Sequence, residues 1–339
     1  MKYLKLGNKI IGQNQPCFII AEAGANHNHN LNQAKELIDV ASDCGADAIK
    51  FQSIKFDELY LPSFPPSEKV KSLYPAIELP EEWYKELFSH AKKRNILLLS
   101  CPTYIKAVDL LLKFGVAGFK IASPQTKANL PLLSYAAKKQ KPLIISTGYC
   151  NLTDIEQALR VCQKARNNQI VLLHCTAKYP ILANQANLKV MGTLAKKFKT
   201  LVGYSDHTLG FNVSLGAVAL GACVLEKHFT LSRKLKGPDH FYAQEPKELK
   251  EMIKQIREVE QSFGKGKKTV LSEEKKLYSY IQTRVAAKCD IKKGQVLKWE
   301  MLDFKRMPRG FLANEWEKLL NKKVKKDIKK GEPFFLKHI

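Results

Sequence analysis

The chain has no apolar run long enough to span a membrane, and its amino terminus, MKYLKLGNKIIGQNQP, lacks the apolar stretch of a signal peptide. Its eight cysteines form neither a CxxC pair nor a zinc-ribbon spacing, and most lie inside apolar runs, where cysteine behaves as a small hydrophobic residue. These absences argue against a membrane span, a disulfide scaffold and a structural zinc site. They predict a reduced, cytoplasmic protein.

Acidic residues are in the minority, because 56 Lys and Arg face 32 Asp and Glu and give a net charge of +24. A nucleic-acid-binding protein gathers its basic residues with aromatic residues on one face. Here the lysines are scattered, and the basic run 322–330 alternates with apolar and acidic residues. We therefore expect no nucleic-acid partner, and a charge that favours solubility and anionic small molecules.

The length, 339 residues, exceeds what one hydrophobic core usually supports, so we expect two domains. The first part contains eight apolar runs, each nearly continuous, as in strands that are buried on both faces. They are 18–24, 48–54, 96–102, 118–123, 142–147, 170–175, 201–206 and 223–229. Amphipathic segments that predict helices lie between them or follow the last, among them 32–44, 81–94, 152–165, 188–198 and 245–263.

Eight strands, each followed by a helix, predict an α/β fold of the (β/α)8 TIM-barrel type over residues 1–265. A doubly wound sheet is the alternative, but it rarely needs eight parallel strands. The long connection 55–80 is rich in proline and serine, and we expect it to be a loop near the barrel mouth.

The last part of the chain has a different pattern. Residues 266–283 read as a linker, and 284–339 as a small β-rich domain. Within it, AKCDIKKG at 287–294 is repeated as VKKDIKKG at 324–331, which predicts a pseudo-twofold arrangement.

The segment 201–230 predicts a strand, a buried helix over 210–221, and a second strand, with His207 after the first strand and His228 at the end of the second. Parallel strands joined by a helix bind ligands at their carboxyl ends. The two imidazoles, with three neighbouring polar side chains, indicate a divalent-metal site. The neighbours are Ser205, Asp206 and Glu226. The alternative is a pair of strand-end histidines bonded to the backbone.

Two lysines, Lys50 and Lys120, stand inside otherwise apolar strands. Burying an ammonium group costs several kcal/mol unless it is paired. Together with three strand-end serines they predict a binding site for phosphate and carboxylate. These serines are Ser123, Ser146 and Ser205. Glu22 is then free to act on a proton or to hold a sugar hydroxyl; its alternative role is to pair with one of the lysines.

With these residues in place, the chain resembles the sialic acid synthase family from about residue 16 to the end. The resemblance rests on FIIAEAGANHNHN (18–30), GADAIKFQS (45–53), FKIAS (119–123), PLIISTG (142–148), LLHCTAKYP (172–180), VGYSDHTLG (202–210), GAVALGACVLEKHFT (216–230) and GPDH (237–240). The tail resembles the antifreeze-like (SAF) domain that ends these synthases.

Members of that family condense phosphoenolpyruvate with an open-chain N-acetylmannosamine-type sugar and release phosphate. The resemblance implies that a divalent metal, Mn²⁺ or alternatively Mg²⁺ or Co²⁺, binds His207 and His228. It implies that phosphoenolpyruvate is held by Lys50, Lys120, Ser123, Ser146 and Ser205, and that the sugar is faced by Glu22, Gln52, Tyr179 and Asp239.

The resemblance also implies a domain-swapped homodimer in which a tail arginine reaches the sugar of the neighbouring subunit. Arg306 is our candidate for this arginine and Arg309 is its rival. Our catalytic candidates are Glu22, Lys50, Lys120, Gln125 and Asp206.

The chain departs from the family pattern at three places. Gln125 stands where the family usually has a glutamate, Ala177 replaces an asparagine, and the family TPF segment is Cys101-Pro102-Thr103. The GPDH motif favours a product of the N-acetylneuraminate or legionaminate type over pseudaminate. The alternatives are condensation on a phosphorylated sugar, as in octulosonate synthesis, and a barrel with weakened catalysis that binds sugars.

Overall fold

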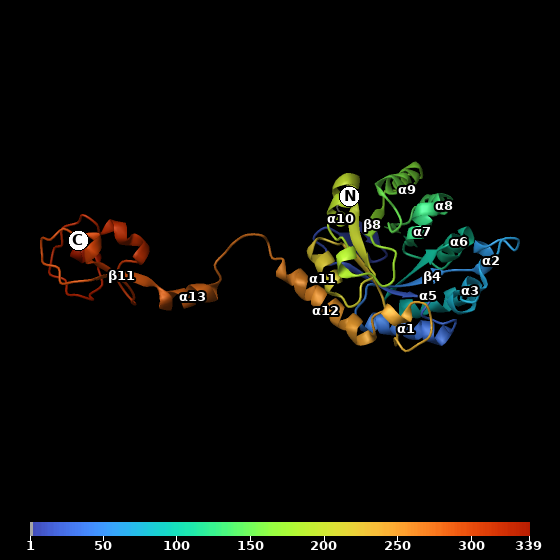
Figure 1. The fold of residues 1–339 in the computed structure, drawn as a ribbon, viewed down its shortest axis with the longest axis horizontal. Coiled ribbons are helices and arrows are strands. Elements are labelled where there is room, and N and C mark those ends of the chain that lie inside the picture. The colour runs from blue at the N-terminus through green and yellow to red at the C-terminus, as the bar shows by residue number, and fades with distance from the viewer. Residues whose placement is uncertain (1–2) are drawn as a thin grey trace. The chain divides into compact units, whose positions relative to one another are not determined.

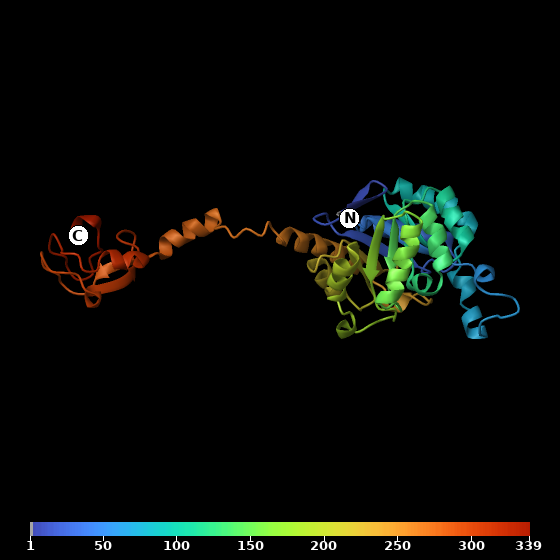
Figure 2. The same cartoon turned by 90° about the horizontal axis from the view of Figure 1, so that it is seen from above.

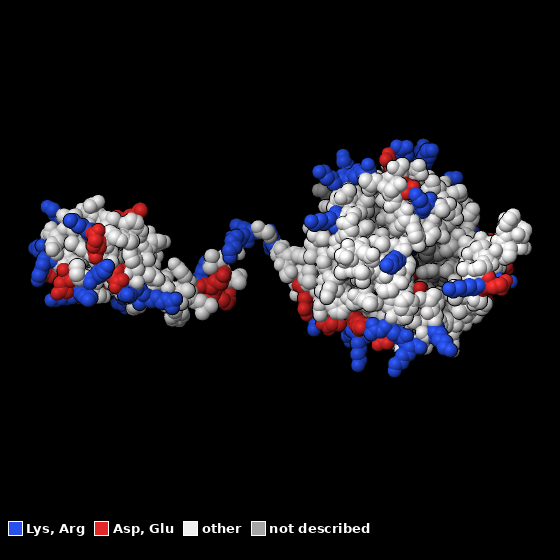
Figure 3. Space-filling view, in the orientation of Figure 1, with Lys and Arg blue, Asp and Glu red and all other residues white. Residues whose placement is uncertain are grey.

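The computed structural model describes residues 3–339, and the chain divides into two compact units, Met1–Phe263 and Gly264–Ile339. Figures 1 and 2 show the two units. Lys and Arg are spread over both units and interspersed with Asp and Glu on the face in Figure 3, as the scattered sequence pattern predicts. Within residues 3–339 no helix has the length and apolar character needed to cross a membrane.

The first unit is built on eight parallel strands, all at the predicted positions. They are β3 (Phe18–Gly24), β4 (Ala48–Ser53), β5 (Leu97–Pro102), β6 (Phe119–Ile121), β7 (Leu143–Ser146), β8 (Ile170–His174), β9 (Leu201–Asp206) and β10 (Val224–His228). Hydrogen-bonded neighbours follow the order β5-β4-β3-β10-β9-β8-β7-β6, and β5 lies beside β6, so the sheet forms a nearly closed barrel. The predicted barrel is confirmed.

Helices cover the outside of the strands (Figure 1). They include α1 (Leu31–Asp43), α5 (Tyr84–Lys93), α6 (Ile105–Lys113), α8 (Leu130–Lys138), α9 (Leu152–Lys164), α10 (Val190–Phe198), α11 (Asn212–Ala219) and α12 (Pro246–Ser262). Each amphipathic face adds to one core shared with the strands. Helix α11 is buried only along one side, because Leu220 at its end is 59% exposed, so the expectation of a fully buried helix is wrong.

The connection 55–80 is not a plain loop, because it contains the short helices α2 (Phe56–Leu59), α3 (Glu68–Lys71) and α4 (Tyr74–Ile77). A hairpin that the sequence analysis did not predict, β1 (Tyr3–Leu6) with β2 (Lys9–Gly12), precedes the barrel. Its buried side chains, Leu4, Leu6 and Ile11, join the barrel core.

In the second unit, helix α13 (Ser272–Ile281) lies within the segment predicted as a linker, and β11 (Thr283–Ala287) pairs with β12 (Leu302–Arg306). The two DIKKG repeats pair with each other. Ile291 and Ile328 exchange two backbone hydrogen bonds of 2.9 Å, and each aspartate of the repeats accepts a 2.8 Å bond from the other repeat's backbone. This reciprocity confirms the pseudo-twofold arrangement.

Candidate active site

The period of two along a strand determines which side chains reach the barrel interior. On β10, Glu226 reaches inward and lies 3.3 Å from the ammonium group of Lys120 on β6. The next residue, Lys227, reaches outward to Asp206 at the end of β9. Residues two apart therefore share the inner face at the carboxyl ends of the strands.

The interior contains a buried network of two lysines and two carboxylates. The Lys50 ammonium group lies 2.8 Å from Glu22 and 3.9 Å from Glu226, which also approaches Lys120. Lys120 donates a 2.8 Å hydrogen bond to Ser146. All four charged side chains are at most 5% exposed. The predicted convergence of the two lysines is confirmed, and Glu226 is the group that joins them.

The two carboxyl groups of this network differ in their electrostatics. Burial raises the pKa of Glu22, although Lys50 opposes this shift. Burial would also raise the pKa of Glu226, but the ammonium groups of Lys120 and Lys50 lower it to about 2. Burial alone would lower the pKa of Lys50, but the two carboxylates of Glu22 and Glu226 raise it above its usual value. Glu22 is thus the carboxyl group better able to hold a proton.

His207 and His228 lie together at the same mouth, with ring centroids 5.6 Å apart. His207 donates from Nδ1 to the Thr176 carbonyl at 2.7 Å, which leaves Nε2 as an unprotonated nitrogen 3.4 Å from the Ser205 hydroxyl. Burial, with His228 adding to it, lowers the pKa of His207 to about 4, and burial lowers that of His228 to about 4. Both imidazoles are therefore neutral, as metal ligands must be.

The His228 side of the mouth also contains Tyr242 and Asp239. His228 Nδ1 is 3.3 Å from the Tyr242 hydroxyl, which donates to Asp239 at 2.8 Å. A Cβ on Gly24 would lie 2.8 Å from Asp239 and 3.5 Å from atoms of both Gln52 and Glu22, so these side chains meet over one glycine. Gln52 donates to Glu22 at 3.0 Å. A ligand here would meet two carboxyl groups, an amide and a phenol.

Tyr179 follows β8, and its ring lies 4.1 Å from that of His207 and 5.7 Å from that of His228. The side chain is 45% exposed, so one part contacts the histidines and another part faces the opening. Tyr179 therefore borders the mouth, as predicted.

Ser123 lies at the start of α7 (Ser123–Ala128), directly after β6, and accepts a 2.9 Å hydrogen bond from the backbone of Gly148. A Cβ on Gly148 would lie 2.8 Å from this hydroxyl and 3.1 Å from both Ala177 and Cys175, so glycine is required for this close approach. The cluster joins the carboxyl ends of β6, β7 and β8.

Asp206 lies on the outer side of β9, away from the network of lysines and carboxylates, so its contacts do not support the predicted catalytic role. Its carboxylate accepts hydrogen bonds from Lys227 at 2.9 Å, Ser214 at 2.6 Å and the backbone and hydroxyl of Thr208 at 2.8 Å each. These partners lie between the barrel and helix α11. Asp206 therefore fixes the ends of β9 and β10, and with them the directions of His207 and His228.

Two other predicted residues lie outside the eight barrel strands. Gln125 lies on α7, where its side-chain oxygen is buried without a hydrogen-bond partner in the described part of the chain. Arg306 ends β12 of the second unit and is exposed. The sequence analysis places Glu226 near the two histidines but does not include it among the catalytic or substrate-binding candidates. Its position two residues before His228 is the signal that both side chains share the inner face.

The residues at the mouth fit a divalent cation with an open coordination shell. No group of three or more His, Cys, Asp and Glu side chains that could hold a metal occurs among residues 3–339, so two imidazoles are what the protein offers. The Thr176 carbonyl orients one of them as an outer-shell partner does in metal sites. A divalent cation held by these two nitrogens would take its remaining ligands from water and substrate, and the metal stays a prediction.

Comparisons with known proteins identify relatives of both units of the chain. The NeuB family model matches residues 37–268 and the SAF domain model matches residues 283–339. The chain is 44% identical over 326 residues to an N,N'-diacetyllegionaminic acid synthase of Campylobacter jejuni, with 93% of this chain and 97% of the relative covered. It is 35% identical to the N-acetylneuraminate-9-phosphate synthase of Mus musculus, with 93% and 90% covered.

Among solved structures, an N-acetylneuraminic acid synthetase from Leptospira borgpetersenii matches with a TM-score of 0.75 and 36% identity, covering 82% of this chain and 96% of that one. The family model covers more than half of the chain, and several relatives exceed 30% identity over nearly their whole length. The chain therefore belongs to the NeuB family.

Proposed function

We propose that this protein is a sugar-acid synthase, a transferase that condenses phosphoenolpyruvate with the open-chain form of an N-acetylated amino sugar and releases phosphate. The observation that carries the proposal is the convergence of Lys50, Lys120 and Glu226 beside His207 and His228 at one barrel mouth. Two ammonium groups suit an anion with phosphate and carboxylate ends, and two neutral imidazoles suit a divalent cation.

The lysines and serines would hold phosphoenolpyruvate. Lys120 already donates to Ser146, and Ser205 donates to Glu226 at 3.2 Å, so these four groups form one buried polar network. Their positions are fixed by strand ends before any substrate arrives. This preorganisation lowers the cost of binding and orients the reactive C3 carbon of phosphoenolpyruvate.

In the reaction, C3 of phosphoenolpyruvate forms a bond to the aldehyde carbon of the sugar, whose oxygen takes a proton. Water then adds to C2, and the bond between C2 and the phosphate oxygen breaks to release phosphate. A divalent ion, Mn²⁺ first among the candidates, would supply Lewis-acid polarisation of the aldehyde when bound by His207 and His228. Glu22, whose pKa is raised by burial, would hold or release the proton at a sugar hydroxyl beside Gln52 and Asp239.

The acceptor we favour is a sugar of the N-acetylmannosamine or diacetamido type, giving a product of the N-acetylneuraminate or legionaminate type. The 44% identity to an N,N'-diacetyllegionaminic acid synthase supports this choice, and so does Asp239 in the GPDH motif, whose carboxylate lies against Gly24. Solved heptulosonate synthases share only the barrel fold at 15–16% identity, so they do not bear on the acceptor. The 35% identical relative named N-acetylneuraminate-9-phosphate synthase makes a phosphorylated sugar the alternative acceptor.

The test is phosphate release from phosphoenolpyruvate, with and without Mn²⁺, over a panel of 2-acetamido and diacetamido sugars. We expect release only when both an acceptor and the metal are present. Lys120→Gln should abolish release, whereas Lys164→Gln, which changes an exposed lysine on α9, should not change it. Absence of release with every acetamido sugar would overturn the proposal and favour a sugar-binding barrel.

The homodimer stays a prediction, and we propose that it completes the binding site for this acceptor sugar. A second copy would contribute Arg306 from its tail domain to the sugar site. Sedimentation of the full chain tests the dimer, and phosphate-release kinetics of Arg306→Ala test the contribution of the arginine.

A further inference from the structure

A cavity of about 720 Å³ lies at the other end of the barrel from the candidate active site. Its walls come from the turn between β1 and β2, from α5 with residues 95–98 at the start of β5, and from residues 113–117 before β6. These are the amino-terminal ends of strands whose carboxyl ends form the mouth. The cavity thus lies where β5 and β6 adjoin without a hydrogen-bonded ladder between them in the described chain.

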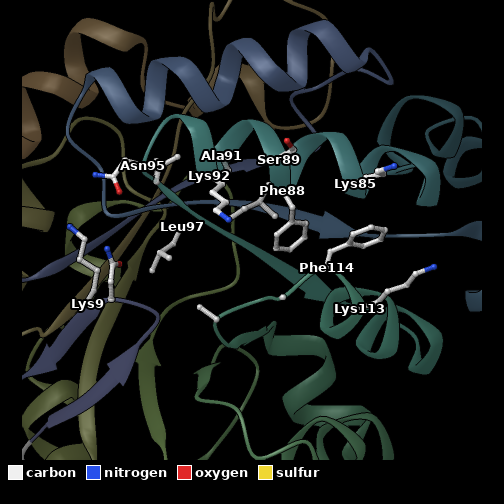
Figure 4. A pocket seen from close by; sticks show the side chains of 15 residues that line it. Lys9, Lys85, Phe88, Ser89, Ala91, Lys92, Asn95, Leu97, Lys113 and Phe114 are labelled. Atoms are coloured by element: carbon white, nitrogen blue, oxygen red, sulfur yellow. The ribbon is translucent and has the colours of Figure 1, made fainter.

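The floor of this cavity is apolar and aromatic. The rings of Phe88 and Phe114 lie 6.2 Å apart at an angle of 23°, and Leu97 continues the surface (Figure 4). Gly115 next to them has a positive φ of 80° and open space where a side chain would be. The volume is within the range of about 300–1,000 Å³ that is typical of small-molecule sites.

The charges around this floor have one sign. Lys9, Lys85, Lys92 and Lys113 line the cavity, and none of its lining residues is Asp or Glu. Lys9 is neutralised by Asp47 at 2.9 Å, but the other three lysines form no ion pair with a carboxylate within residues 3–339. In Figure 4, Lys92 points into the cavity beside Phe88. A ligand here would need an apolar ring and a negative charge.

We propose that this cavity binds a nucleoside phosphate, with the base against Phe88 and Phe114 and the phosphate near Lys92 and Lys113. Aromatic side chains stack on the faces of bases, and lysines recognise phosphate as point charges. Asn8, Ser89 and Asn95 supply uncharged donors and acceptors for the sugar and base edges. Because the site is remote from the mouth, the proposal does not depend on the proposed reaction.

The test is calorimetric titration of the full-length protein with the four common nucleoside 5′-monophosphates, ribose 5-phosphate and the four nucleosides. We expect at least one nucleotide to bind with a Kd below about 1 mM, and more weakly as salt is raised. Removing the base should weaken binding by about tenfold or more, as stacking contributions require. Phosphoenolpyruvate should not displace the nucleotide.

Variants locate the binding. Lys92→Gln and Lys113→Gln should each weaken it by about two- to fivefold, as exposed charge pairs do, and Phe88→Leu should weaken it without unfolding the protein. Lys164→Gln, far from the cavity on α9, is the matched control and should bind as the unchanged protein does. Equal affinity for ribose 5-phosphate, displacement by phosphoenolpyruvate, or no effect of these variants would each overturn the proposal.

Discussion

Replacing Glu226 by glutamine removes the one negative charge that lies between the two buried lysines. The carboxylate is 3.3 Å from the Lys120 ammonium group and 3.9 Å from that of Lys50. After the change Lys50 keeps Glu22 at 2.8 Å, whereas Lys120 keeps only the hydroxyl of Ser146. The variant therefore leaves one buried ammonium group without a carboxylate.

The magnitude follows from these distances. With an effective dielectric constant of about 20, a pair of unit charges at 3.3 Å is worth ~5 kcal/mol. Relief of the buried carboxylate offsets part of this loss, and removing one partner of a buried pair costs about 3–5 kcal/mol. Because a glutamine oxygen still accepts from Ser205, we expect the low end, ~3 kcal/mol, and a fall in Tm of about 6–12 °C.

Thermal unfolding of Glu226→Gln at increasing concentrations of inorganic phosphate measures both the loss of stability and its recovery when an anion binds between the lysines. Phosphate should raise the Tm of the variant more than that of the unchanged protein, because it replaces the missing charge between the lysines. Asp109→Asn, which removes an exposed pair with Lys139, is the control and should change stability by no more than about 1 kcal/mol. A fall in Tm below about 2 °C, or equal phosphate effects, would refute the reasoning.

Three further predictions address the strand ends and the tail. Lys227→Met should lose about 3–5 kcal/mol of unfolding free energy, measured by denaturant titration, because it leaves Asp206 buried without its partner. Lys227→Met combined with Asp206→Asn should lose less than the sum of the two single losses, and additive losses would contradict the pairing. His207→Ala should weaken Mn²⁺ binding, followed by calorimetry, by more than about 100-fold, because even outer-shell changes cost about 10–100-fold. Arg306→Ala should raise the KM for the sugar far more than that for phosphoenolpyruvate, and Arg309→Ala should leave both unchanged; equal and small effects would contradict the tail assignment.

The barrel was predictable because its strands are buried on both faces. Such strands appear as continuous apolar runs, and all eight runs became strands within a few residues of their predicted bounds. The amino-terminal hairpin was missed, although Leu4 and Leu6 alternate with exposed Tyr3 and Lys5 in the pattern of a strand with one buried face. Two four-residue strands give too short a pattern to stand out beside the longer runs.

The same continuity explains why Asp206 was chosen as a catalytic candidate. A run that is apolar on both faces does not reveal which residues point inward, so every polar residue at a strand end looked equivalent. Counting in steps of two from His207 places Ser205 on the inner face and Asp206 on the outer one, where Lys227 neutralises it. Asp239 lies in a loop after β10 rather than at a strand end, so counting along a strand cannot place it. Only the fold brings it to Gly24.

The charged groups around Glu226 and Glu22 differ, and this difference indicates a different role for each carboxyl group. Glu226 contacts both lysines and a serine, so its ionised form is stabilised and it holds the ammonium groups in place. Glu22 contacts one lysine and lies next to Gln52, in a position where burial favours its protonated form. Environments that separate two carboxyl groups in this way distinguish a proton-transfer group from a permanent charge. Glu22 is therefore the group in this network suited to exchange a proton with a bound sugar, and Glu226 is suited to position the lysines for an anion.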